Sequence, residues 1–303
     1  MKKKESVTNS DILKDKFINT LDRYDLIPQN KNKIFIFYSG GKDASILADL
    51  MLWYRQKIRP DLELTLLTVM FPEIVYKSPD PEQARAVDEA LGYWKYKGYR
   101  IRLIDLPEGI GDHLFEGKET PCEVCEKVKN KIFFDELSKP DYDGSLVCLA
   151  HTLNDIVGYL SEIQFIAGSY SSWRNLMESN TDLFNRVLVL AKRVYPKYEP
   201  NNLQVTYIKP LIELEEKEIQ HNVILRDLPL IPELCAEKRG PKYKIYKRFV
   251  MEGLDWLDKR YARESFHDKL LFKNYSRLLD FFNNTYLLPP VEEIQKMGLL
   301  SGI

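Results

Sequence analysis

An α/β fold, with a mostly parallel sheet of about five strands and helices on both faces, is predicted for this chain. Short runs rich in β-branched and aromatic residues alternate with longer amphipathic segments between about residues 31 and 208. Strands that alternate with helices in this way form parallel sheets, which the helices cover on both faces. Beyond residue 213 the periodicity is mostly helical, so a helical C-terminal region is expected to follow the sheet.

The predicted elements follow one another in a regular order. Residues 1–30 form a polar lead-in that contains a helix, because Ile12, Phe17 and Leu21 recur at near-helical spacing. The first predicted strand runs directly into two glycines, and a helix follows them. The predicted strands are 33–38, 64–70, 100–105, 145–150 and 203–208, and the helices between them are 44–56, 80–97, 122–138 and 155–167.

This order of elements is Rossmann-like, and such sheets bind ligands beyond the carboxyl ends of their strands. The stretch 168–202 is rich in Ser, Asn, Tyr and Arg, and we expect a flexible insertion there, over the ligand site. We divide the chain into a helical lead-in at 1–30, an α/β domain at 31–235, and a helical C-terminal region with a basic arm at 236–303.

The composition argues against several classes of protein. The chain has 303 residues, of which 44% are hydrophobic and 29% charged, as in an ordinary soluble protein. No apolar run reaches the roughly 18–20 residues that span a bilayer, so no membrane association is expected. The N-terminus is charged but has no apolar stretch behind it, which argues against a secretory signal peptide. Four cysteines do not make a disulfide framework, and a reducing cytoplasm is the expected setting.

The charge is unevenly distributed along the chain. The net charge is −1, yet residues 236–277 hold twelve Lys or Arg against six Asp or Glu. The basic arm, residues 237–248, interleaves these cations with tyrosines. Cations neutralise phosphates and tyrosines stack on unpaired bases, so the arm indicates a polyanionic partner such as tRNA. A solvated helix face is the alternative explanation of the same charges.

Residues 39–43, Ser-Gly-Gly-Lys-Asp, lie between the first predicted strand and the helix after it. Glycines there let backbone N–H groups approach an anion, and the helix N-terminus adds about half a positive charge. Lys42 adds a full charge, and Ser39 and Ser45 offer hydroxyls. Asp43 would repel a phosphate unless Mg²⁺ bridges them or the carboxylate orients a reacting group. The spacing is not that of a Walker A loop, and the alternative is a tight turn with Asp43 as helix cap.

The cysteines form a second candidate site. Cys122 and Cys125 are three residues apart at the start of a predicted helix, where two thiols can hold one metal. Cys235 lies much further along the chain, and spacing alone does not bring it to the pair. Two other roles for these thiols remain open. They could bind zinc, with Cys148 or a histidine as the fourth ligand, or they could carry a persulfide without any metal. Cys148 lies inside an apolar strand, which is typical of an inert core thiol.

Residues 39–43 resemble the PP-loop of the N-type ATP pyrophosphatases, which include GMP synthetase, tRNA lysidine synthetase, adenylylsulfate reductases and tRNA thiolases. These enzymes cleave ATP between the α and β phosphates and usually adenylate a substrate oxygen. The family usually has Ser directly after the Asp, whereas this chain has Ala44 and then Ser45. The resemblance implies that Lys42 and Asp43 are catalytic. It implies an ATP and Mg²⁺ site made of Ser39, Gly40, Gly41, Lys42, Asp43 and Ser45.

The cysteines resemble those of the tRNA 2-thiocytidine and 2-thiouridine synthetases, which combine a PP-loop, a Cys-x-x-Cys at a helix start and a later third Cys. In that subgroup three thiolates hold a [4Fe–4S] cluster, and its fourth iron is open to carry sulfur. The resemblance implies that Cys122, Cys125 and Cys235 hold such a cluster and act in catalysis.

Weaker similarities extend the resemblance over about residues 33–240. Residues 150–155 resemble a Gly-His-x-x-Asp-Asp signature, in which His151 and Asp155 match and Asn154 replaces the first Asp. The resemblance therefore implies that His151 and Asp155 belong to the ATP site. Residues 209–212, Lys-Pro-Leu-Ile, resemble an Arg-Pro-Leu segment of the same subgroup.

The function predicted from these features is ATP-dependent insertion of sulfur into a nucleobase, expected in tRNA, through an adenylated intermediate with release of pyrophosphate and AMP. A donor protein or sulfide is the expected sulfur source, and a homodimer is compatible with the sequence. One alternative is a PP-loop enzyme that thiolates another acceptor, either DNA phosphate or a small metabolite. A sulfonucleotide reductase and a non-catalytic nucleotide-binding protein are the others.

Overall fold

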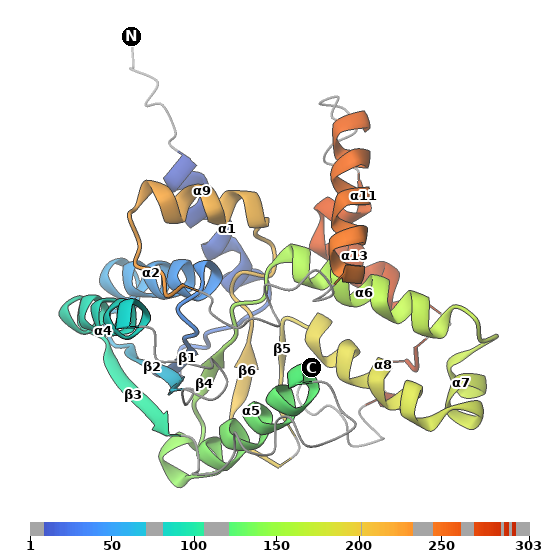
Figure 1. Ribbon diagram of the computed structural model, residues 1–303, viewed down its shortest axis with the longest axis horizontal. Helices are drawn as coiled ribbons and strands as arrows, with labels where there is room; N and C mark the ends of the chain where they lie inside the picture. Colours follow the sequence, from blue (N-terminus) through green and yellow to red (C-terminus); the bar gives the residue numbers. More distant parts are fainter. Residues whose placement is uncertain are drawn as a thin grey trace.

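A computed structural model of the chain describes residues 9–70, 81–105, 121–200, 202–232, 245–261, 270–285, 288–290 and 293–294. Its centre is a six-stranded sheet in the order β3-β2-β1-β4-β6-β5 (Figure 1). The strands are β1 (Lys33–Phe37), β2 (Glu63–Met70), β3 (Arg100–Asp105), β4 (Leu146–Cys148), β5 (Lys197–Tyr198) and β6 (Thr206–Ile208). All neighbouring strands pair in parallel except β5, which is antiparallel to β6.

The predicted α/β class with a mostly parallel sheet is confirmed, but the sheet has six strands and not about five. The strand that the prediction lacks is β5, which has two residues and is too short to show an alternating pattern. Its register is set by β6, because Lys197 pairs with Ile208 and Tyr198 pairs with Tyr207.

Helices between the parallel strands supply the crossovers, and further helices precede β1 and follow β6. The helices are α1 (Asn9–Arg23), α2 (Lys42–Lys57), α4 (Pro81–Tyr96), α5 (Pro121–Leu137), α6 (Leu153–Ala167), α7 (Trp173–Ser179), α8 (Thr181–Val194), α9 (Glu216–Leu225), α11 (Ile245–Tyr261) and α13 (Tyr275–Asn283). Short 3-10 turns lie at Pro140–Tyr142 and Leu271–Lys273. No helix in the described ranges combines the length and apolar character that a membrane crossing requires.

The sheet is covered on both faces because its strand residues alternate between two apolar layers. Ile34 and Ile36 of β1 are fully buried on the face covered by α1, α2, α4 and α9. Phe37 points to the other face, where its ring lies 4.1 Å from the ring of Phe133 in α5. Figure 1 shows α5 on the opposite side of the sheet from α1, α2 and α9.

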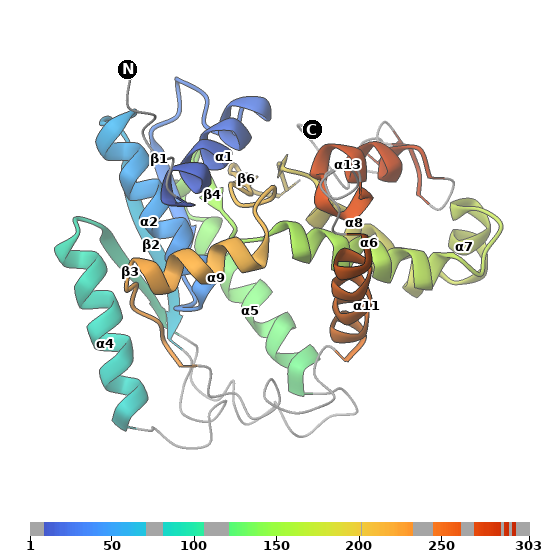
Figure 2. The ribbon, with the colours of Figure 1, turned by 90° about the horizontal axis from the view of Figure 1, so that it is seen from above.

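A third apolar cluster lies beside the sheet and is formed by α6, α8 and α13. It includes Ile156 of α6, Val187 and Leu190 of α8, and Leu278 and Phe282 of α13. The figures place this helical layer, with α7 at its far end, on the side of the molecule opposite α4 and β3 (Figures 1 and 2).

The prediction of a flexible insertion at residues 168–202 is wrong, because α7, α8 and β5 occupy most of this stretch. The polar residues that suggested a loop are in fact caps of these helices. Ser172 Oγ accepts from the Asn175 N–H at 3.2 Å, and Asn180 Oδ1 accepts from the Leu183 N–H at 3.1 Å. The apolar face of α8 is buried against α6, which sequence composition does not show.

The N-terminal helix α1 packs directly on the sheet domain. Leu13, Phe17 and Leu21 are buried in the same cluster as β1, and Lys16 forms an ion pair with Glu218 of α9. The three-part division of the chain stays a prediction.

Candidate functional site

Three of the loops implicated by the sequence meet at one edge of the sheet. β1, β4 and β6 are parallel neighbours, so their carboxyl ends lie side by side. The loop at 38–41 follows β1, residues 149–152 follow β4, and Lys209 follows β6. α2 and α6 begin directly after the first two of these loops, and α9 begins beside α6, as the contact of Asn154 described below shows.

The loop after β1 has a backbone that requires glycine. Gly40 has a φ of +75°, and a Cβ at this position would lie 2.4 Å from the side chain of Ile231. The Ile231 N–H donates to the Gly40 carbonyl at 2.9 Å, which fixes the loop against the segment after α9. Gly41 is the N-cap of α2 and provides no side-chain cap, so the first-turn N–H groups can receive an anion.

Lys42 stands at the first turn of α2 between two carboxylates. Its Nζ lies 3.1 Å from Asp43 and 3.1 Å from Glu216, the first residue of α9. Burial lowers the pKa of Lys42, but the two carboxylates outweigh burial and raise it above its ordinary value. Lys42 is therefore held charged, as a site for a polyphosphate requires. Glu216 has no counterpart in the sequence prediction, because nothing in its spacing connects it to the loop at 39–43.

Asp43 has one carboxylate oxygen in use and one buried without a partner. Oδ2 accepts from Lys42 at 3.1 Å, whereas Oδ1 has no hydrogen-bond partner among the described residues. Burial raises the pKa of Asp43; the charge of Lys42 lowers it, and the carboxylates of Asp155 and Glu216 raise it further. Oxygen ligands from one or two carboxylates, completed by phosphates and water, are what Mg²⁺ takes. The residues present therefore fit Mg²⁺ bound together with a nucleotide.

Ser45, predicted at the ATP site, is fully buried one turn into α2. Its hydroxyl donates to the Pro229 carbonyl at 3.0 Å and lies 3.3 Å from the Tyr38 hydroxyl. These contacts join α2 to the segment after α9. Ser39 lies at the surface of the loop, and its Oγ accepts weakly from the Gly41 N–H at 3.4 Å.

The segment after β4 brings His151 and Asp155 to the start of α6. The Asp155 carboxylate accepts from the Thr152 N–H at 3.0 Å and from the Thr152 hydroxyl at 3.2 Å, as in a helix cap. Asn154, which departs from the resembled signature, has a contact of its own. Its Oδ1 accepts from the Glu216 N–H at 2.8 Å and so joins the starts of α6 and α9.

An array of aromatic and cationic groups continues from His151 along α6. The ring of Tyr159 lies 5.6 Å from the ring of His151 in an edge-on arrangement, and the Arg193 guanidinium of α8 lies 5.6 Å from the same tyrosine ring. All three side chains are half-buried. Tyr159 and Arg193 have no sequence signal, because only the antiparallel packing of α6 on α8 brings them together.

Lys209, after β6, is fully buried. Its Nζ donates to the carbonyls of Tyr195 and, at 3.2 Å, of Lys192, at the end of α8, and it lies over the ring of Tyr198. Burial, aided by the charge of Arg193, lowers the pKa of Lys209 to about 7.

Of the four cysteines, the structure describes the side chain of Cys148 alone. Cys148 is a free thiol, fully buried in β4, and burial raises its pKa. Cys122 and Cys125 lie in the first turns of α5, but their side chains are outside the described residues, as is all of Cys235. The basic arm also lies outside them, except for the backbone of residues 245–248 at the start of α11. Within the part that is described, no three His, Cys, Asp or Glu side chains are placed to hold a metal ion.

Comparison with known proteins gives the following. No family model matches the chain. The chain is 24% identical over 244 residues to the tRNA-cytidine(32) 2-sulfurtransferase of Burkholderia orbicola, covering 78% of this chain and 61% of that protein. The protein of the same name from Burkholderia cenocepacia gives the same values. The chain therefore spans about 61% of the length of these curated relatives.

Among solved structures, the fold is similar to that of the U34-tRNA thiolase NcsA from Methanococcus maripaludis with its [4Fe–4S] cluster. The TM-score is 0.61 at 19% identity, over 90% of this chain and 80% of that chain. These comparisons confirm the resemblance to PP-loop proteins of tRNA thiolation that residues 39–43 and the cysteines indicated.

Proposed function

We propose that the chain is an ATP-dependent sulfurtransferase that inserts sulfur into a nucleobase of tRNA through an adenylated intermediate. The observation that carries this proposal is the Oδ1 of Asp43 at the start of α2, which is buried beside Lys42 and has no hydrogen-bond partner among the described residues. The loop before it needs glycine at position 40. A nucleotide bound with a divalent cation is the ligand that suits this combination. The similarity to tRNA sulfurtransferases supports tRNA as the acceptor.

In this proposal the first-turn N–H groups of α2 and the Lys42 ammonium hold the ATP phosphates. Asp43, through Oδ1, is the ligand for Mg²⁺, which when bound neutralises charge on the phosphates. A carbonyl oxygen of the base attacks the α-phosphorus, the bond to the bridging oxygen breaks, and pyrophosphate leaves. The O-adenylated base then loses AMP when sulfur attacks the same carbon. Ser45 supports the loop through its bonds to Pro229 and Tyr38.

The array of His151, Tyr159 and Arg193 is the proposed wall for the acceptor base. Unpaired bases stack on aromatic rings and guanidinium planes, and these side chains are half-buried at the edge where α6 begins. Asp155 holds the start of α6 through Thr152, so its part in the proposed ATP site is to orient this edge.

Cys122, Cys125 and Cys235 are the proposed ligands of a [4Fe–4S] cluster, which when bound supplies an iron open to sulfur. The support is the sequence pattern and the cluster named for the Methanococcus maripaludis thiolase. A donor protein or sulfide as sulfur source, a homodimer and a cytoplasmic setting complete the proposal.

The proposal is tested by incubating anaerobically purified protein with ATP, Mg²⁺, sulfide and unmodified tRNA. We expect pyrophosphate release that depends on tRNA, and a thiolated nucleoside detectable by mass spectrometry. Asp43→Asn should abolish both while the thermal unfolding curve is kept. Asp182→Asn, which changes an exposed acidic residue in the first turn of α8, is the matched control and should act like the wild type. Pyrophosphate release that needs a different acceptor, or none, would refute tRNA as the substrate.

The cysteine assignment has its own test, which compares iron content across four serine variants. Cys122→Ser, Cys125→Ser and Cys235→Ser should each lose iron and sulfur transfer together. Cys148→Ser should keep iron and lose only some stability, because a hydroxyl replaces a thiol that is fully buried in an apolar cluster. Iron retained by Cys235→Ser and lost by Cys148→Ser would show that the third ligand is misassigned. Absence of iron from all four variants and from the wild type would favour zinc or a persulfide.

A further inference from the structure

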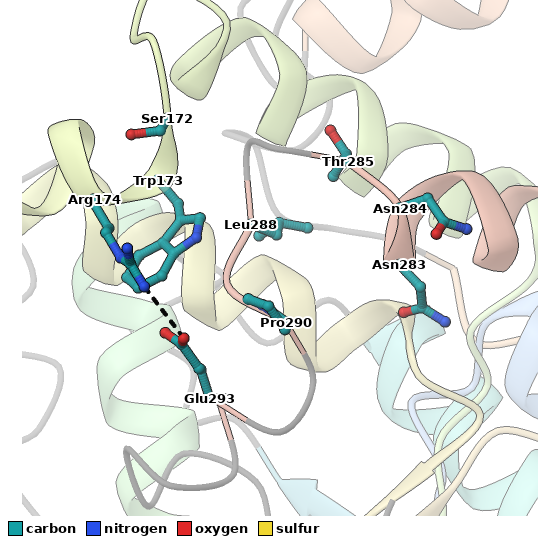
Figure 3. A pocket seen from close by; sticks show the side chains of 9 residues that line it. All are labelled: Ser172, Trp173, Arg174, Asn283, Asn284, Thr285, Leu288, Pro290 and Glu293. Atoms are coloured by element: carbon teal, nitrogen blue, oxygen red, sulfur yellow. Dashed lines mark hydrogen bonds and ion pairs between the residues drawn. The ribbon is translucent and has the colours of Figure 1, made fainter.

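A hollow lies between the start of α7 and the segment after α13, far from the phosphate loop at residues 39–43. Its volume is ≈ 440 Å³, within the about 300–1,000 Å³ of typical small-ligand pockets. Figure 3 shows Trp173 and Arg174 on one side, Asn283, Asn284 and Thr285 on the other, and Leu288 between them. Figures 1 and 2 place α7 at the opposite end of the molecule from α4 and β3.

The Trp173 side of the pocket is a layered aromatic and cationic surface. The Arg174 guanidinium lies 4.9 Å from the Trp173 ring centre, and the Trp173 ring is stacked on Phe184 of α8 at 6.3 Å with an interplanar angle of 22°. Phe184 is buried in the cluster of α6 and α8, so the indole is anchored by its packing and its orientation is fixed. Rigid layers of this kind stack on flat, delocalised rings.

The charge of the pocket argues for a neutral ligand group. Arg174 forms an ion pair with Glu293 at 3.4 Å, so the one cation lining the described part of the pocket is balanced by a carboxylate (Figure 3). A phosphate would meet repulsion from Glu293. A neutral ring with amino and carbonyl groups would instead find a carboxylate acceptor and, across the pocket, two carboxamides that both donate and accept.

We infer that this pocket receives an unpaired nucleobase of the RNA acceptor, at a site separate from the base that reacts. The inference rests on the proposed function, because tRNA is the ligand that offers single-stranded bases. A macromolecule can reach both the phosphate loop and this pocket, which a small metabolite cannot span. The pocket then acts as a docking point that recognises a splayed-out base by stacking on Trp173 and Arg174.

The test measures affinity for unmodified tRNA with the full-length protein and three substitutions. Arg174→Ala and Trp173→Ala should each weaken tRNA binding by about 5- to 150-fold, the range for loss of a stacked base. Trp173→Phe, which keeps the packing on Phe184, should lose less. Arg85→Ala is the matched control, because Arg85 is an equally exposed arginine paired with a glutamate, on α4. It should bind tRNA as the wild type does, and tRNA-independent ATP binding should be unchanged in every variant.

Salt dependence separates base stacking from phosphate contact. If Arg174 stacks on a base, Arg174→Ala leaves the slope of log affinity against log salt unchanged; loss of about one unit would identify a phosphate contact and overturn the base site. Adenosine, cytidine, guanosine and uridine monophosphates form a second arm. Tight binding of a mononucleotide that Arg174→Ala abolishes, with tRNA affinity unaffected, would make this a free-nucleotide site and refute the inference.

The two proposals fail in different ways. If the wild type neither binds nor thiolates tRNA, the proposed function falls, and the RNA pocket falls with it. If the wild type binds tRNA and Arg174→Ala binds it equally well, the pocket alone is wrong.

Discussion

Two lysines at the same edge of the sheet have opposite electrostatic surroundings. Lys42, after β1, is partly exposed and paired with Asp43 and Glu216, which raise its pKa. Lys209, after β6, is fully buried, donates to the main-chain carbonyls that end α8, and has a pKa lowered to about 7. A lysine that must meet an anionic ligand keeps its charge and its access to solvent, whereas one that supports the fold can be buried and lose its proton.

The difference also separates activity from stability. Lys42 lies between two carboxylates at the start of α2, so in the proposed function its contribution is to nucleotide binding and catalysis. Lys209 donates to two main-chain carbonyls at the end of α8, so its contribution is to the packing of α8 on the sheet. Substitutions at the two positions should therefore have effects of different kinds.

The largest effect is expected for Lys42→Met. Loss of the ammonium should lower pyrophosphate release by about a hundred- to a thousandfold, as for removal of one charge-stabilising group from an active site. The free energy of unfolding should change by no more than about 1 kcal/mol, because partly exposed ion pairs contribute little. Lys217→Met removes an exposed lysine paired with Asp255 and is the control. Normal turnover in Lys42→Met would contradict the proposed role of Lys42 in nucleotide binding and catalysis.

Gly40→Ala should come next, because it strains the loop that presents Lys42. The left-handed backbone costs a non-glycine residue about 1–2 kcal/mol, and the clash with Ile231 adds about 1–3 kcal/mol. We expect a loss of about 2–5 kcal/mol in urea unfolding, together with weaker ATP binding. In the helix α4, Gly92→Ala meets no atom within 4 Å and should instead stabilise the protein by about 0.5–1 kcal/mol. Equal effects of the two substitutions would contradict the strain at Gly40.

Lys209→Met tests whether Lys209 contributes to stability, through the pH dependence of the free energy of unfolding. Between pH 7 and about 10 the unfolded chain holds the lysine proton and the folded chain does not, so the free energy of unfolding rises with pH. The slope that Lys209 contributes is at most about 1.4 kcal/mol per pH unit. Lys209→Met should remove this contribution, whereas Lys197→Met, at a half-exposed lysine of β5, should keep it. Parallel pH curves for the wild type and Lys209→Met would show that Lys209 is protonated in the folded protein.

The smallest effect is expected for Asn154→Ala, which removes the acceptor for the Glu216 N–H. Stability should fall by about 1 kcal/mol, the usual cost of a lost helix-terminus hydrogen bond. Because Glu216 also pairs with Lys42, the apparent affinity for ATP should fall slightly as well. Asn154→Asp keeps an acceptor oxygen and should preserve the stability. Failure of Asn154→Asp to do so would mean that the contact is not the source of the loss.

The features that the sequence predicted are those encoded over short stretches of chain. The strand at residues 33–38 and the glycines after it determine a loop at a helix start, because backbone conformation depends on adjacent residues. The same holds for the helix that begins at Cys122 and Cys125. The helices α7 and α8 were missed because their polar caps and exposed faces resemble a loop, and only the burial of Phe184 and Val187 against α6 shows otherwise.

The sequence by itself determined the α/β class and the glycine loop at residues 39–43, together with the charged residues at the start of the helix that follows it. The tertiary structure alone placed Glu216 beside Lys42, Asn154 against Glu216, Arg193 over Tyr159, and Trp173 opposite Asn284. The physical reason is distance along the chain. Contacts between residues that are dozens of positions apart depend on which helices pack together, and that packing follows from the whole pattern of buried surface rather than from any local spacing.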